Sequence, residues 1–268
     1  MKRIGILSLR GGAGATTVTA NLAQALVQVQ KNVLVVDAVD ANLLRLHLGL
    51  PISSVEGWAS HMCANTDWQS AGFESPNGVT FLPFGQLSLH NARQFEANRG
   101  PYLAEILEAL GRFEVGDNQD HWQLIHLGSS DLALLEDEAF GYFFDTVLVV
   151  LTPDAACYSV LQDVFETQAV FNDAPVSAKV RYVLNQYQPE TEISRDFMLV
   201  MKRELGAEMS PVLLHRGHRS DGQCGKSDHS AAVCPNQPGG KRLSVTRLLV
   251  RVAIVSHPVC FLSLCSTP

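Results

Sequence analysis

The chain has 268 residues, of which 46% are hydrophobic and 18% are charged, and its formal net charge at pH 7 is −7. A chain of this length and composition can bury a sizeable core, which excludes a disordered, collagenous or coiled-coil protein. The negative net charge excludes a globally basic surface of the kind that grips nucleic acid.

Neither a leader peptide nor a membrane span is predicted. The chain enters a short apolar segment directly after Met1-Lys2-Arg3, without a cleavage-site pattern behind a long apolar run. The nearest candidate for a membrane span, residues 248–265, is broken by Arg251, His257 and Pro258, so no uninterrupted apolar run reaches the roughly 18 residues that a spanning helix needs. We therefore expect a cytoplasmic protein. The six cysteines form no Cys-x-x-Cys pair, which argues against a zinc site or a disulfide framework.

Short apolar segments alternate with helical patterns along residues 1–216. The expected strands are residues 4–7, 33–36, 79–82, 122–127, 146–151, 180–184 and 211–214. The expected helices are residues 16–29, 43–48, 102–110, 160–170 and 195–205. This alternation predicts an α/β fold with a mostly parallel sheet covered by helices on both faces. Ligands of such sheets bind beyond the carboxyl ends of the strands, so residues 8–16, 37–42, 127–131, 152–156 and 185–188 are the places to look.

A glycine-rich turn follows the first expected strand. Gly11, Gly12 and Gly14 precede Thr16-Thr17 and the first expected helix. Glycines allow backbone N–H groups to close around phosphate oxygens, and the start of a helix adds partial positive charge. A threonine hydroxyl in the first turn can also bind Mg²⁺. The pattern indicates a phosphate-binding loop, and the alternative is a tight strand–helix turn.

The segment from Arg10 to Thr17 resembles the deviant P-loop of the ParA/MinD ATPases. Further segments resemble the BcsQ (YhjQ) family of cellulose biosynthesis proteins within that superfamily: residues 34–38, 42–46, 57–59 and 82–88. The resemblance implies a P-loop NTPase-like three-layer sandwich of the ParA/MinD type over residues 1–216.

The same resemblance implies a site for ATP and Mg²⁺. ATP would contact the following residues: Arg10, Gly11, Gly12, Ala13, Gly14, Ala15, Thr16, Thr17, Pro153 and Asn185. Mg²⁺ would be held by Thr16 and Asp37, and Asp40 and Arg10 would be the catalytic residues. Asn185 is equally compatible with a turn at a strand end, and residues 152–154 with a helix N-cap.

Several positions depart from the ParA/MinD pattern. Ala15 replaces the usual lysine, which leaves Arg10 as the charged residue of the loop. The spacing from Asp37 to Asp40 is one residue too long. His126 stands where an aspartate supports Mg²⁺, and we expect a packed, hydrogen-bonded histidine there, because hard cations prefer oxygen ligands. We therefore expect nucleotide binding without efficient hydrolysis.

The resemblance also implies partners. It predicts an ATP-dependent homodimer that pairs with a small BcsR-like protein and supports a cellulose synthase complex at the inner membrane, often near the pole. Trp58, Trp68 and Phe84 are expected in the core or in dimer contacts rather than as a stacking site. The alternatives are a ParA-type ATPase acting on DNA or another cargo, and an inactive relic. DNA is not an expected partner.

The composition changes after residue 216. Residues 217–241 are rich in glycine, serine, histidine and cysteine, and residues 243–268 are basic and apolar. Permitted codons for residues 217–226, read one nucleotide forward, can encode a helix-forming sequence like the family's continuation: aspartate, threonine, glutamate, alanine, methionine, alanine, asparagine, alanine, alanine, lysine. We expect residues 217–268 to be a frameshifted, poorly ordered tail, and the alternative is a genuinely divergent one.

The nucleotide sequence of the gene tests the frameshift. We expect the frame shifted by one nucleotide to continue beyond codon 217 as an alanine-rich, helix-forming sequence. An early stop codon in that frame, or a translation without helical character, would show that the tail is genuine.

Overall fold

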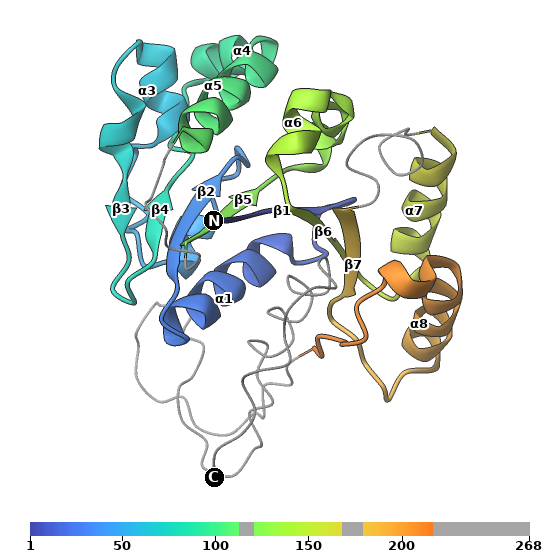
Figure 1. Ribbon diagram of the computed structural model, residues 1–268. Helices are drawn as coiled ribbons and strands as arrows, with labels where there is room; N and C mark the ends of the chain where they lie inside the picture. Colours follow the sequence, from blue (N-terminus) through green and yellow to red (C-terminus); the bar gives the residue numbers. More distant parts are fainter. Residues whose placement is uncertain (113–120, 168–178, 217–268) are drawn as a thin grey trace.

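The computed structural model describes residues 1–112, 121–167 and 179–216, and the predicted frameshifted tail lies outside these residues. A sheet of seven strands has the order β3-β4-β2-β5-β1-β6-β7 (Figure 1). The strands are β1 (Lys2–Ser8), β2 (Asn32–Asp37), β3 (Phe73–Glu74), β4 (Thr80–Leu82), β5 (His121–His126), β6 (Thr146–Leu151) and β7 (Val180–Leu184). Only the β3–β4 pairing is antiparallel among the pairings of these strands.

Helices cover both faces of the sheet. They are α1 (Ala15–Gln28), α2 (Leu44–His47), α3 (Trp58–Ala64), α4 (Leu89–Ala97), α5 (Arg99–Gly111), α6 (Glu138–Phe143), α7 (Ala155–Thr167) and α8 (Glu192–Leu205). Short 3₁₀ helices are η1 (Trp68–Ala71), η2 (Ser129–Glu136) and η5 (Gly206–Glu208). No helix in the described ranges is long and apolar enough to cross a membrane.

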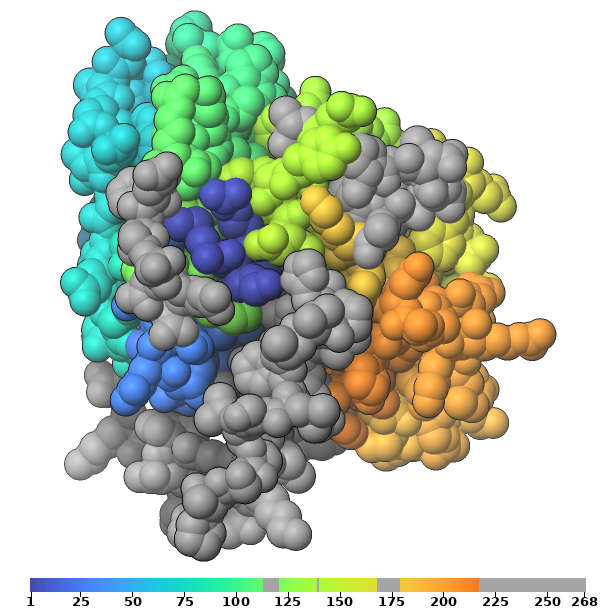
Figure 2. All heavy atoms as spheres, viewed as in Figure 1, coloured from blue at the N-terminus to red at the C-terminus, as the bar shows by residue number. Residues whose placement is uncertain are grey.

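Two apolar clusters, one on each face, hold the layers together. One cluster joins α1 and α2 to the sheet, and the other joins α3, α5, α7 and α8 to the opposite face. Figure 2 shows α3, α4 and α5 as a cyan and green lobe at the upper left, with α7 and α8 at the opposite side. Strand β6, which lies between β1 and β7, is buried at every position, as its unbroken apolar sequence predicts. The predicted three-layer α/β sandwich is confirmed.

Some elements differ from the prediction. The strand expected at residues 211–214 is absent from the described part of the chain, where isolated bridges at Met209 and His215 stand instead. Pro211 has no N–H to offer a ladder, and the N–H of Val212 donates to Ser210 Oγ at 3.3 Å. Helix α7 begins at Ala155, before the expected residue 160, because Asp154 caps it by accepting from the N–H of Cys157 at 2.8 Å.

The family-like segments 57–59 and 82–88 pack against each other. A Cβ on Gly57 would lie 2.1 Å from the backbone nitrogen of Gly85, so only glycine permits this approach. Trp58 and Phe84 are buried, with ring centroids 5.4 Å apart in an edge-to-face contact, which confirms their predicted place in the core. The indole N–H of Trp58 donates to the carbonyl of Asp37 at 2.8 Å. These segments therefore hold α3 against the end of β2.

A buried ion pair joins α5 to two loops at the same edge of the sheet. The Nε and Nη2 atoms of Arg99 donate to the two carboxylate oxygens of Asp131 at 2.6 and 2.9 Å. Arg99 Nη2 also donates to the carbonyl of Ala38 at 2.7 Å, and the N–H of Gly128 donates to Asp131 at 2.7 Å. The side chain of Asp131 is 1% exposed, so these partners take the place of water as its hydrogen-bond donors.

We expect Arg99→Ala to lower the free energy of unfolding by about 3 kcal/mol, because the buried carboxyl group of Asp131 would lose both hydrogen bonds from its partner. Urea unfolding of the full chain measures this change. Arg112→Ala is the matched control, since Arg112 follows the same helix in an exposed pair with Glu108 and should have no measurable effect. Equal losses in the two variants would contradict the assigned role of the Arg99–Asp131 pair.

Candidate functional site

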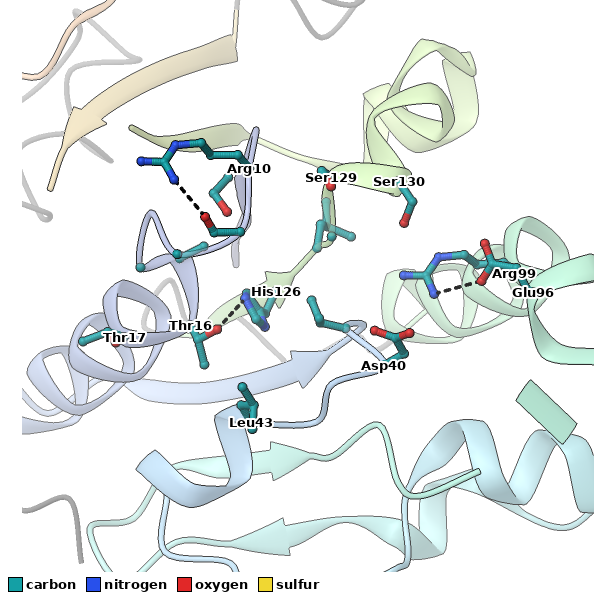
Figure 3. Close-up of a pocket in the computed structure, with 18 of the residues that line it drawn as sticks. Arg10, Thr16, Thr17, Asp40, Leu43, Glu96, Arg99, His126, Ser129 and Ser130 are labelled. Atoms are coloured by element: carbon teal, nitrogen blue, oxygen red, sulfur yellow. Dashed lines mark hydrogen bonds and ion pairs between the residues drawn. The ribbon is translucent and has the colours of Figure 1, made fainter. Parts of the chain in front are cut away.

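A cavity of about 920 Å³ opens at the carboxyl edge of the sheet (Figure 3). Its walls come from the glycine-rich turn and the start of α1, from residues 39–47, from α4 with Arg99, and from residues 126–130. Four of the five segments singled out in the sequence meet at this cavity, the fourth through Gln186, because parallel strands bring their carboxyl ends to the same edge.

The glycine-rich turn presents an open helix start to this cavity. Gly14 is the N-cap of α1, which has neither a side-chain cap nor an acidic residue in its first turn. Gly12 and Gly14 have φ values of 82° and 96°, which side-chain-bearing residues rarely adopt. A Cβ added at Gly11 or Gly12 would meet nothing within 4 Å. The N–H groups of such a helix start, with its dipole, suit an anion the size of a phosphate.

The guanidinium of Arg10 is engaged beside this turn. It donates to Asp154 Oδ2 at 2.7 Å and to Thr152 Oγ1 at 3.0 Å, and Figure 3 shows it pointing away from Asp40 and Arg99. Burial raises the pKa of Asp154, but hydrogen bonds from Thr152, Cys157 and Arg10 outweigh it, so the pKa lies below its ordinary value. Arg10 therefore faces an ionised carboxylate at neutral pH.

Two amides brace the turn from the end of β7. Asn185 Nδ2 donates to the carbonyl of Ala13, and Gln186 Nε2 donates to the carbonyl of Gly12, both at 2.8 Å. A Cβ at Gly14 would lie 2.3 Å from Asn185 Nδ2, so this contact requires glycine. Pro153 is buried. Its two neighbours in the chain, Thr152 and Asp154, are the residues that accept hydrogen bonds from Arg10.

Thr16, His126 and Asp37 form a row from the cavity into the core. His126 Nε2 lies 3.4 Å from Thr16 Oγ1, and His126 Nδ1 lies 2.8 Å from Asp37 Oδ1. Thr16 and His126 line the cavity, whereas Asp37 is fully buried. Asp37 Oδ1 also accepts from the N–H of Val39, and Asp37 Oδ2 is buried and has no hydrogen-bond partner among the described residues. His126 is thus packed and hydrogen-bonded, as expected from the sequence.

The wall across from the glycine-rich turn holds the predicted Asp40 together with charges that the sequence analysis did not identify. Asp40 lies there near Arg99 and Glu96 (Figure 3), and Arg93 of α4 lines the same cavity. Burial and the neighbouring imidazole of His126 lower the pKa of His47, so His47 adds no positive charge at pH 7. The sequence feature that could have predicted α4 is Ser88, a residue type that favours the start of a helix. It caps α4 by accepting from the N–H of Asn91 at 3.2 Å.

The donor set suits a phosphate chain better than a bare cation. No group of three His, Cys, Asp or Glu side chains that could hold a metal ion occurs among residues 1–112, 121–167 and 179–216. Thr16 and Asp40 are oxygen donors facing the cavity, so Mg²⁺ would need phosphate oxygens to complete its coordination. The residues present therefore fit Mg²⁺ as a companion of a bound polyphosphate.

Comparison with known proteins agrees with this architecture. A ParA family ATPase from Chlorobium tepidum TLS has a TM-score of 0.57 at 18% identity, covering 78% of this chain and 81% of that one. Cobyrinic acid a,c-diamide synthase from Mycobacterium smegmatis, with a bound ATP analogue and magnesium, has a TM-score of 0.53 at 19% identity, covering 76% and 82%. The fold is therefore of the ParA/MinD P-loop type.

The sequence comparisons are more specific. Cellulose biosynthesis protein BcsQ from Escherichia coli (strain K12) is 30% identical over 222 residues, which cover 81% of this chain and 80% of that protein. The family model of the cellulose biosynthesis protein BcsQ matches residues 1–221. The match includes the glycine-rich turn and both segments that pack α3 against the sheet. The chain belongs to the BcsQ family of cellulose biosynthesis proteins.

Proposed function

We propose that this protein binds ATP and serves as a regulatory or assembly component of bacterial cellulose synthesis and secretion. The observation that carries the proposal is the uncapped, glycine-lined start of α1, which opens into the large cavity of a chain matched by the BcsQ family. ATP supplies the anion that such a helix start selects. Cellulose synthesis enters through the family alone.

The proposed nucleotide site combines the loop with its braces. Residues 11–17 bind the phosphates through backbone N–H groups, and Asn185, which donates to the carbonyl of Ala13, and Pro153 contact the rest of the nucleotide. Thr16 provides a protein ligand to Mg²⁺, and Asp37 supports it indirectly through His126. When bound, Mg²⁺ neutralises part of the phosphate charge. Asp40 is the carboxylate that orients an attacking water.

Hydrolysis is weak or absent in this proposal because the glycine-rich turn itself offers the phosphates little positive charge. Ala15 supplies none, and Arg10 is paired with Asp154. Transferring a phosphoryl group requires positioned charge around the transition state, and loss of one such contact typically costs about 3 kcal/mol. Binding requires less, because backbone N–H groups and the helix dipole remain. A nucleotide-dependent switch or scaffold needs no more than that.

The proposed setting follows the family. The protein acts as a homodimer, pairs with a BcsR-like small protein, and supports the membrane cellulose synthase complex. It lies in the cytoplasm, peripheral to the inner membrane and near the cell pole. These partners are carried over from the family, whose Escherichia coli member is 30% identical to this chain. A pull-down with the synthase components addresses them directly.

We expect Gly11→Leu to weaken ATP binding by at least about tenfold, because its side chain would project into the open space where phosphate binds. A fluorescent ATP analogue titrated into the full chain measures the affinity. Gly111→Leu, at the end of α5, is the matched control, since a Cβ there also meets nothing within 4 Å.

Both variants should keep the unfolding temperature of the parent, because neither new side chain meets a neighbour near its Cβ. Equal ATP affinity in the two variants would show that the phosphates of ATP do not bind at the glycine-rich turn. A parent chain that binds no ATP at millimolar concentration would support the inactive relic instead.

ATP turnover separates the proposal from a ParA-type ATPase, the second candidate favoured by the shared fold. We expect slow turnover that double-stranded DNA does not accelerate, because the chain has a net charge of −7 and lacks the loop lysine. Phosphate release measured with and without DNA is the test. A clear DNA-stimulated rate would favour partitioning of DNA over cellulose synthesis.

A further inference from the structure

Thr16, His126 and Asp37 lie in a row, with His126 in the middle, that joins the first turn of α1 to the ends of two neighbouring strands. Thr16 stands in the first turn of α1, His126 ends β5, and Asp37 ends the neighbouring strand β2. Residues Asp37 and His126 are register partners in the sheet, and the N–H of Ala38 donates to the carbonyl of His126 at 2.8 Å. The imidazole therefore lies between the buried carboxylate and the threonine hydroxyl at the cavity.

Hydrogen-bond chemistry sets the direction of this row. The carboxylate of Asp37 already accepts from the N–H of Val39 and can only accept from the ring as well. His126 Nδ1, at 2.8 Å from Asp37, must therefore carry the proton. The opposite tautomer would set two acceptors against each other in a buried site, which is costly.

The proton on Nδ1 decides what Thr16 does. In a neutral imidazole with Nδ1–H, the Nε2 atom is an acceptor, so the hydroxyl proton of Thr16 turns toward it across 3.4 Å. The lone pairs of the hydroxyl oxygen are then left for the cavity. Thr16 becomes an acceptor toward any cation there and is not free to donate its proton to a phosphate.

We propose that His126 is a positioning residue that transmits the orientation set by Asp37 to the hydroxyl of Thr16. This inference rests on the proposed nucleotide site and assigns a role to the histidine that replaces the aspartate of the resembling ATPases. An aspartate in this place would add a negative charge beside the phosphate site. The imidazole orients Thr16 without that charge, which reduces the repulsion of a polyphosphate.

Nitrogen-15 NMR of the labelled full chain without nucleotide tests the row itself. From the hydrogen-bond geometry we expect the His126 ring to show a proton on Nδ1 and none on Nε2. Thr16→Val should shift the Nε2 resonance, whereas Thr16→Ser, which keeps the hydroxyl, should leave it near the parent position. A His126 ring protonated on Nε2, or an Nε2 signal indifferent to Thr16→Val, would overturn the inference.

The Mg²⁺ dependence of ATP affinity tests the consequence. We expect Thr16→Val, which removes the ligand, and His126→Phe, which removes the partner that orients it, each to reduce the ratio of affinities with and without Mg²⁺ by about tenfold. The double variant should reduce this affinity ratio no further than either single variant, because both substitutions break the same contact between Thr16 and His126. His126→Gln, whose amide oxygen can accept from Thr16, should recover part of the ratio.

Unfolding temperatures measured beside the titrations show which variants fold. A parent-like ratio in folded His126→Phe or a strictly additive double variant would overturn the role of His126. If the parent itself binds no ATP, the proposed function fails, while the NMR result still decides the tautomer and the contact with Thr16.

Discussion

The buried carboxylate of Asp37 is the constraint on which the arrangement of the cavity depends. A carboxyl group with no exposed surface depends on hydrogen bonds within the protein, and Asp37 Oδ1 obtains them from His126 on the next strand and from the N–H of Val39. Its own carbonyl accepts from Trp58. One residue thus fixes the end of β2 relative to β5 and α3, and through His126 it reaches the first turn of α1.

The family-like segments that nucleotide chemistry does not require support the helices of the opposite wall without lining the cavity themselves. The contact between Gly57 and Gly85 seats α3 on the end of β4, and Trp58 and Phe95 extend that packing to α4, with ring centroids 5.4 Å apart. Helix α5 follows α4 directly and carries Arg99 to Asp131. A cavity wall with its own charges therefore faces the glycine-rich turn, and the chain's resemblance to BcsQ extends well beyond a phosphate loop.

The sequence was sufficient where a local pattern determines the structure. Apolar runs such as residues 146–151 and the glycines before Thr16 specify a strand and a turn by themselves. Contacts between distant residues could not be read in this way. His126 lies 110 residues from Thr16, and Arg99 lies 32 residues from Asp131, so neither partner is visible in a local pattern. Helix α4 was missed because its apolar positions are few, and residues 211–214 looked like a strand although Pro211 cannot extend a ladder.

The two amides that follow β7 can hydrogen-bond the glycine-rich turn only late in the synthesis of the chain. The carbonyls of Gly12 and Ala13 are held by amides 174 and 172 residues further along the chain. During translation the turn emerges from the ribosome early, because it lies near the N-terminus. The side chains that hold it emerge only after most of the strands have been made. A nascent polypeptide therefore carries an unbraced turn for most of its elongation, and the turn gains these two hydrogen bonds only after the last described strand has been synthesised.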